Sequence, residues 1–140
     1  MFYVGIDIAK NSHEVSVIDS NGTLIEKSFS FLNNQEGCDK LISFFKKFEL
    51  DNSNVTIGME ATGHYWLALY SYLIELDFTI FVINPIQSDA FRKIYIRKTK
   101  NDSKDSFIIA QIMRFGQYSP SSIATENILA MKIYTRYRFS

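Results

Sequence analysis

The chain opens with a nearly continuous apolar run, Phe2-Tyr3-Val4-Gly5-Ile6-Asp7-Ile8, whose polar exception is Asp7. Such a run is typical of a central strand that is covered on both faces, rather than of a strand with one face in water. His13 to Asp19 then alternates apolar and polar residues, Asn21-Gly22 is a tight-turn pair, and Thr23 to Phe31 is again rich in strand-forming residues. These three segments predict an antiparallel meander.

Helical and strand patterns alternate along the rest of the chain. Apolar residues recur at three- and four-residue steps over 34–48, 65–75 and 102–116, and again from 126, which predicts helices there. The apolar runs 55–59 and 78–83 predict two more strands, the second ended by Asn84-Pro85. Strands joined through helices require right-handed crossovers, so we expect one mixed sheet flanked by helices, of the α/β class.

The charges are divided unevenly along the chain. The 140 residues carry 15 basic and 15 acidic side chains, so the net charge is zero. Residues 1–89 hold five Lys or Arg against twelve Asp or Glu, whereas residues 90–140 hold ten against three. Such an asymmetry points to a polyanionic partner or a membrane surface.

The sequence carries no signal for secretion or membrane insertion. It has no cationic, apolar leader at its start and no apolar run of about 18 residues. The single cysteine, Cys38, cannot form an internal disulfide, and its place on the apolar face of the 34–48 helix favours a buried small side chain over a reactive thiol. We therefore expect a cytoplasmic protein with no membrane partner.

Carboxylates mark two predicted strand ends and one predicted helix start. Asp7 interrupts the first strand, and Glu60 follows the strand 55–59 at the edge where open α/β sheets bind ligands. Asp102 and Asp105 are three residues apart and project from one face of the helix that they open. Each has an ordinary alternative: a strand-end carboxylate bonds to a turn or to water, and Asp102 caps the helix with Asp105 in its first turn.

Convergence of the four side chains would change their chemistry. Adjacent strands would bring Asp7 beside Glu60, and a helix entering next to them would add Asp102 and Asp105. Clustered carboxylates repel one another unless they are neutralised, and hard divalent cations with oxygen ligands are the usual remedy. Two such ions about 4 Å apart can activate a nucleophile and stabilise the leaving oxygen of a phosphodiester.

Basic residues gather just before and around Asp102. Beside a metal site, Lys and Arg can hold the phosphate backbone that the metals attack, although a charged segment can also be a solvated surface loop. His64 could line the same pocket as a proton carrier or phosphate donor, or it could simply cap or pack at a helix start. The candidate nucleic-acid ligands are Arg92, Lys93, Arg97, Lys98, Lys100 and Lys104.

Three segments carry a family resemblance when they are taken together. They are Val4-Gly5-Ile6-Asp7-Ile8-Ala9-Lys10, Met59-Glu60-Ala61-Thr62-Gly63-His64-Tyr65 and Lys98-Thr99-Lys100-Asn101-Asp102-Ser103-Lys104-Asp105. In this order and spacing they resemble the N-terminal DEDD domain of bacterial insertion-sequence transposases, the recombinases guided by a bridge RNA. The resemblance spans nearly the whole chain, and Lys10 joins His64 as a possible accessory residue.

The resemblance implies a ribonuclease H-like fold of the Holliday-junction-resolvase type, with Asp7, Glu60, Asp102 and Asp105 as ligands of Mg²⁺, for which Mn²⁺ can be substituted. It also implies a bacterial protein with DNA and guide RNA as partners, which assembles into dimers or tetramers. In that family a C-terminal domain supplies a serine for strand exchange. We expect residues 1–125 to be the catalytic domain and 126–140 to begin a linker helix, with the serine domain absent and full recombination therefore beyond this chain alone.

Two other functions fit parts of the pattern. Sugar kinases and actin-like ATPases also open with a strand, an acidic residue and a hairpin, but they need a second glycine-rich loop and a second lobe, which 140 residues with six scattered glycines do not accommodate. A non-catalytic nucleic-acid-binding module of the same fold would keep the carboxylates without a metal. Stabilisation by Mg²⁺ or Mn²⁺ favours the enzyme, metal-insensitive stability the binding module, and stabilisation that requires ATP the kinase-like protein.

Overall fold

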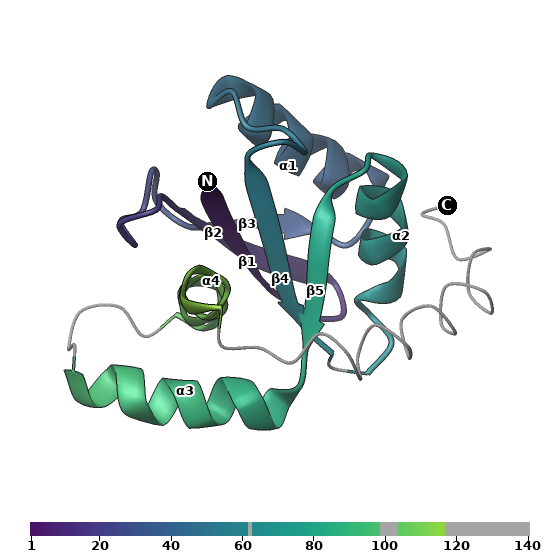
Figure 1. Ribbon diagram of the computed structural model, residues 1–140. Coiled ribbons are helices and arrows are strands. Elements are labelled where there is room, and N and C mark those ends of the chain that lie inside the picture. Colours follow the sequence, from purple (N-terminus) through teal and green to yellow (C-terminus); the bar gives the residue numbers. More distant parts are fainter. Residues whose placement is uncertain (62, 99–103, 117–140) are drawn as a thin grey trace.

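A computed structural model describes residues 1–61, 63–98 and 104–116, which form a five-stranded sheet with helices on both faces (Figure 1). The sheet has the order β3-β2-β1-β4-β5. Its first three strands pair antiparallel, while β4 is parallel to β1 and β5 is parallel to β4. The elements are β1 (Phe2–Asp7), β2 (Ser12–Ile18), β3 (Phe29–Leu32), α1 (Gln35–Lys47), β4 (Val55–Glu60), α2 (Leu67–Glu75), β5 (Thr79–Ile83), α3 (Pro85–Lys98) and α4 (Asp105–Phe115). The expected mixed sheet, made of a meander plus parallel strands, is confirmed.

The helices form two layers around the sheet. α1 and α2 cover one face, where Val4 and Ile6 of β1 are buried in the main core. α4 lies on the opposite face, with α3 beside it (Figure 1). The predicted central strand β1 is thus covered on both sides. No helix among the described residues combines the length and the apolar character that a membrane crossing requires.

Two facing glycines allow α4 to lie directly on the sheet. Gly5 of β1 and Gly58 of β4 are partners in the parallel register. A Cβ at Gly5 would stand 1.9 Å from the backbone oxygen of Ser106 and 2.4 Å from the backbone nitrogen of Ala110. The atoms nearest to a Cβ at Gly58 would be those of the flexible side chain of Met113, the first of them at 2.6 Å. The glycine in the first motif is therefore a packing requirement of α4.

Helix α3 is the element that the sequence patterns did not predict. Asn84-Pro85 does end β5, but the same pair also starts a helix, because Asn84 Oδ1 accepts the N–H of Ile86 at 2.8 Å and proline is well suited to a first helical position. The basic segment, for which the sequence also allows a surface loop, consequently begins inside a helix. Asn followed by Pro was the available signal for it.

Smaller differences concern where elements begin. The turn at 19–22 forms, with Gly22 at φ +85° and Asp19 accepting the N–H groups of Asn21 and Thr23, but regular pairing resumes only at Phe29 apart from a bridge between Ile18 and Leu24. α2 begins at Leu67 rather than at residue 65, and α4 begins at Asp105 rather than at residue 102. Cys38 is fully buried on α1, as expected, and burial raises the pKa of its thiol to about 12.

Candidate active site

Asp7 and Glu60 are the last residues of two adjacent parallel strands. β1 and β4 pair with Gly5 opposite Gly58 and Ile6 opposite Met59, so both carboxylates follow at the same edge of the sheet. Since strand side chains alternate between faces, Asp7 and Glu60 share the face of Gly5 and Gly58, on which α4 packs. Both are half-buried. The prediction that these two strands would bring the two residues together is correct.

Asp105 reaches the same edge from α4. It is the first residue of that helix, follows the N-cap residue Lys104, and keeps 49% of its side chain exposed. No side-chain bond caps the helix at Lys104. Asp105 thus stands in the first turn, as the ordinary helix-start alternative also required. Asp102, the fourth carboxylate of the predicted quartet, lies outside the described residues.

The electrostatics of Asp7 show that these carboxylates are neighbours. Burial raises the pKa of the Asp7 carboxyl, and the negative charges of Asp105, Glu14 and Glu60 raise it further. The positive charge of Arg92 acts in the opposite direction. An ionised Asp7 is therefore destabilised by residues that are far apart in the sequence, which is the situation that a bound cation relieves.

Glu14 is a neighbour of the site that sequence reasoning missed. It pairs with Asp7 across the β1–β2 ladder, and it lies on the α4 face because Ser106 Oγ donates to its Oε1 at 3.1 Å. Lys104 Nζ stands 3.9 Å from its other oxygen. The β1–β2 hairpin and the strand alternation were the signals that place it beside Asp7, but neither says that Ser106 would reach it.

A buried serine chain supports this corner. Ser106 Oγ lies 2.7 Å from Ser16 Oγ, which in turn lies 2.6 Å from Ser28 Oγ. Ser16 and Ser106 are almost completely buried. Because Ser106 donates its one hydroxyl proton to Glu14, its oxygen must accept a hydrogen bond from the hydroxyl of Ser16. The oxygen of Ser16 must in turn accept a hydrogen bond from the hydroxyl of Ser28. The chain ties the start of α4, next to Asp105, to β2.

Helix α3 contributes two side chains to the site. The hydroxyl of Ser88, which is fully buried, lies 3.0 Å from Glu60 Oε2 and 2.9 Å from the backbone oxygen of Pro85, and its one proton is shared between these two acceptors. Arg92 forms ion pairs with Asp89 at 2.6 Å and with Asp105 at 2.9 Å. Arg92 was predicted as a phosphate ligand, and the structure turns it towards carboxylates. Ser88 could not be predicted because the helix that presents it was not.

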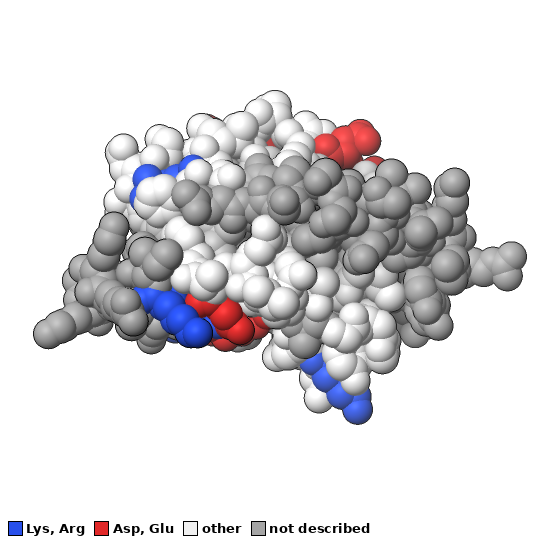
Figure 2. All heavy atoms as spheres, turned by 60° about the horizontal axis from the view of Figure 1, so that its bottom comes forward, with Lys and Arg blue, Asp and Glu red and all other residues white. Residues whose placement is uncertain are grey.

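The other predicted basic residues are placed less completely. Lys93 and Lys104 are exposed. α3 includes Arg97 and Lys98, whose side chains the structure does not describe, and Lys100 lies outside the described residues. Figure 2, which turns the bottom of Figure 1 forward, shows described basic side chains directly beside acidic ones in one place and other basic side chains standing apart, so the described residues form no continuous basic patch on this face. Nucleic-acid contact by these residues stays a prediction.

The two accessory candidates are exposed. His64 packs its ring against Tyr65, with 4.5 Å between the ring centroids. Lys10 lies in the β1–β2 connection, where its carbonyl accepts from Asn33. Among the described residues, no hydrogen bond or ion pair joins either one to Asp7, Glu60 or Asp105. An accessory role for them stays a prediction.

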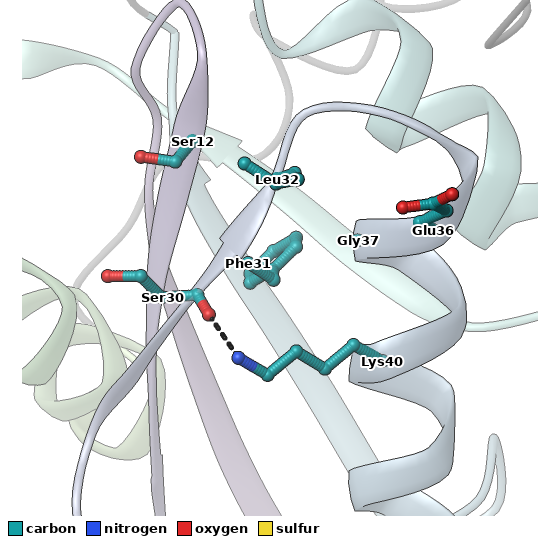
Figure 3. A pocket seen from close by; sticks show the side chains of 7 residues that line it. All are labelled: Ser12, Ser30, Phe31, Leu32, Glu36, Gly37 and Lys40. Carbon is teal, nitrogen blue, oxygen red and sulfur yellow. Dashed lines mark hydrogen bonds between the residues drawn. The ribbon is translucent and has the colours of Figure 1, made fainter.

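A hollow of about 390 Å³ lies away from these carboxylates, at the β3 edge of the sheet (Figure 3). Lys40 of α1 reaches across it and donates to the backbone oxygen of Ser30 at 2.8 Å. The lining residues are Ser12, Ser30, Phe31, Leu32, Glu36, Gly37 and Lys40. None of the candidate site residues belongs to this set.

The donor set suits a hard divalent cation, but the side chains are not yet arranged around one. Carboxylate oxygens are ligands that Mg²⁺ and Mn²⁺ accept in proteins. Because burial and neighbouring carboxylates raise the pKa of Asp7, a cation at this edge would stabilise its ionised form. Within 1–61, 63–98 and 104–116, however, no three Asp, Glu, His or Cys side chains stand close enough together to hold an ion. Asp105 is instead paired with Arg92.

Comparison with known proteins gives a consistent picture. A family model described as a transposase, of the IS110 type with a DEDD site, matches residues 4–140. A pilin gene-inverting protein of Moraxella lacunata is 31% identical over 109 residues, which cover 78% of this chain and 33% of that protein. A mini-circle putative transposase for IS117 of Streptomyces coelicolor is 26% identical over 132 residues, which cover 94% of this chain and 31% of that protein. The chain thus spans about a third of the length of these relatives.

Among solved structures, Thermus thermophilus RuvC in complex with a Holliday junction substrate matches with a TM-score of 0.59. The match covers 86% of this chain and 99% of that one at 13% sequence identity. A likeness at so low an identity speaks for the fold alone. The expected ribonuclease H-like fold of the resolvase type is confirmed.

Proposed function

Because the chain belongs to the IS110 family of DEDD transposases, we propose that it is a metal-dependent catalytic domain that acts on DNA phosphodiester bonds. The observation that carries the proposal is the meeting of Asp7, Glu60 and Asp105 at one edge of the sheet, where burial and neighbouring charge raise the pKa of Asp7. Family membership sets aside the kinase-like alternative. A binding module that holds no metal remains the competing function.

The residues that would hold the ions are Asp7, Glu60, Asp102 and Asp105. Bound there, divalent cations supply activation of a nucleophile and stabilisation of the leaving oxygen in phosphodiester cleavage. The described residues prepare the site by position: β1 and β4 present two carboxylates side by side, and Ser106 with Glu14 ties the start of α4 to β2. The Ser88 hydroxyl, whose proton is shared between Glu60 and the Pro85 backbone oxygen, contacts the carboxylate of Glu60.

The partners follow from the family and from the basic residues of the second part of the chain. We propose that DNA is the substrate and that Arg92, Lys93, Arg97, Lys98, Lys100 and Lys104 supply contacts to its phosphates. RuvC, which shares the fold, was solved with a Holliday junction substrate, in keeping with DNA as the proposed partner. A guide RNA, assembly into dimers or tetramers and a bacterial cytoplasmic setting are proposals for the whole protein.

The domain organisation is part of the same proposal. The described residues form one α/β unit, in keeping with a catalytic domain over 1–125. The proposed linker helix from residue 126 lies outside the described residues. Since the relatives are about three times as long as the stretch matched, we propose that recombination needs parts of the whole protein other than this α/β unit.

The test is metal-dependent stabilisation of the chain. Thermal melting is measured in EDTA and in Mn²⁺ or Mg²⁺ for the wild type, Asp7→Asn and Asp77→Asn. Asp77 is an exposed residue at the opposite end of the sheet, and its φ of 64° is one that asparagine tolerates, so it is a matched control. We expect the metal to raise the melting temperature of the wild type and of Asp77→Asn but not of Asp7→Asn. Melting temperatures that do not change on addition of metal in any of the three proteins would favour the binding module.

A further inference from the structure

Arg92 forms an ion pair with one of the candidate metal ligands, Asp105. Its two terminal nitrogens divide between α3 and α4, with Nη1 2.6 Å from Asp89 Oδ1 and Nη2 2.9 Å from Asp105 Oδ1. Its side chain is only 25% exposed. Arg92 also acts on Asp7, because its charge lowers the pKa that the surrounding carboxylates raise. One guanidinium thus compensates two of the proposed ligands.

The position of Arg92 is not a fully satisfied one. Its Nε is buried and finds no hydrogen-bond acceptor among the described residues. A buried donor without an acceptor loses its hydration with nothing in return. The guanidinium is therefore held through its two terminal nitrogens alone, and its third nitrogen adds nothing to the binding of Arg92 in this position.

Arg92 and a metal ion compete for the same carboxylate. Asp105 Oδ1 already accepts from the guanidinium, and a divalent cation on the other oxygen would stand beside a fixed positive charge. The described carboxylates are also not gathered around a common point while Arg92 engages Asp105. The Arg92–Asp105 ion pair and the separation of the carboxylates have one cause if the guanidinium occupies the position that a bound metal ion would take.

We propose that Arg92 is a positioning residue that serves as the internal counter-cation of this site: it holds Asp105 in the metal-free protein, and a divalent ion gains Asp105 as a ligand only by displacing it. The inference rests on the proposed function, since it takes Asp105 as a metal ligand. It assigns Arg92 a role in regulating metal occupancy that is separate from any contact with phosphate.

The consequence is a gain of metal affinity when Arg92 is removed. Arg92→Gln keeps much of the length of the side chain and loses its charge, so the metal no longer has to displace a cation. Arg92→Lys keeps the charge, but a single ammonium group cannot bridge Asp89 and Asp105 as the two terminal nitrogens of arginine do. The Mn²⁺ affinity of this variant should therefore lie between those of the wild type and Arg92→Gln. Arg114→Gln is the matched control, because Arg114 lies in the last turn of α4, far from Asp105 at its first residue.

The experiment is a Mn²⁺ titration of the chain, followed through the electron paramagnetic resonance signal of free Mn²⁺. We expect the apparent dissociation constant of Arg92→Gln to fall about three- to tenfold below that of the wild type. Arg92→Lys should show a smaller fall, and Arg114→Gln should stay within about twofold of the wild type. Melting in EDTA establishes that each variant is folded before its affinity is compared.

Wild-type or weaker Mn²⁺ affinity in folded Arg92→Gln overturns the inference, as does a similar gain in Arg114→Gln, which would reveal a general effect of net charge. In either case the proposed function survives if Asp7→Asn still abolishes binding. If the wild type and every variant leave the Mn²⁺ signal unchanged, the proposed function fails and the inference fails with it.

Discussion

Replacement of Gly5 by alanine tests the idea that close contact between α4 and β1 builds the site. The added Cβ would stand 1.9 Å from the backbone oxygen of Ser106, whereas real Cβ atoms are essentially never found closer than 3.0 Å to such a neighbour. The backbone of α4 must therefore withdraw by about 1.1 Å. Because the obstacle is backbone, no side-chain rotation can relieve the overlap.

The expected cost follows from overpacking. Inserting one carbon into a close-packed interface costs about 1–3 kcal/mol, and a domain of this size loses about 4 °C of melting temperature per kcal/mol. We therefore expect Gly5→Ala to melt about 4–12 °C below the wild type in EDTA. The same withdrawal moves Asp105 away from Asp7, so the stabilisation by Mn²⁺ should shrink as well.

Gly58→Ala is the matched control, since Gly58 is the register partner of Gly5 and faces the same helix. Its Cβ would meet the side chain of Met113, a flexible thioether that can rotate away, so we expect a change in melting temperature of no more than about 4 °C. Differential scanning calorimetry of the three proteins gives the comparison. A Gly5→Ala variant that melts with the wild type, or a Gly58→Ala variant that loses more, would refute this account of the packing.

Two further predictions concern charge. Burial and the charges of Asp105, Glu14 and Glu60 raise the pKa of Asp7 above its ordinary 3.8, so ionisation of Asp7 opposes folding and the metal-free protein loses stability as the pH rises through the raised value. Asp7→Asn should accordingly have a higher free energy of unfolding than the wild type in EDTA at pH 7, and this difference should decrease as the pH falls towards 3.8. Urea denaturation across this pH range measures the difference, and a difference that does not depend on pH contradicts the prediction. For the nucleic-acid interface, joint replacement of Arg97, Lys98 and Lys100 by alanine should weaken DNA binding. The slope of the logarithm of the binding constant against the logarithm of the salt concentration should become shallower by about 0.9 for each phosphate that is no longer neutralised. Fluorescence anisotropy at several salt concentrations measures both effects. Replacing Lys46 and Lys47, which are exposed in the last turn of α1, is the control, and equal effects in the two variants would mean that DNA binds with no preferred face.

Much of the site could be predicted because local pattern and strand geometry determine it. The buried character of β1 and β4, each ending in a carboxylate, required Asp7 and Glu60 to meet once the two strands paired in parallel. The periodicity of the 102–116 segment likewise predicted a helix that bears Asp105 near its start. These inferences needed only the alternation of side chains and the order of the elements.

The contributions of α3 could not be predicted in the same way. Its charged sequence shows little amphipathic pattern, because only Ser88 is fully buried among residues 85–93, the part of the helix whose burial the structure describes. The packing of Phe91 against Phe115 joins residues that are far apart in the chain. Ser88 on Glu60 and Arg92 on Asp105 depend on where that helix lies. Glu14 was hidden for a related reason, since its role depends on Ser106, which is 92 residues away.

By itself, the amino-acid sequence determined the five strands, every helix except α3, the family, and three of the carboxylates that the folded chain places at one edge, because periodicity and motif spacing are local properties. Only the tertiary structure decided how those charges are balanced. The guanidinium of Arg92 compensates the charge of Asp105. Gly5 and Gly58 allow α4 to approach the sheet closely enough to bring Asp105 to the edge where Asp7 and Glu60 lie. Such balances depend on distances between helices, which side-chain volume and backbone contact set only when the chain is packed.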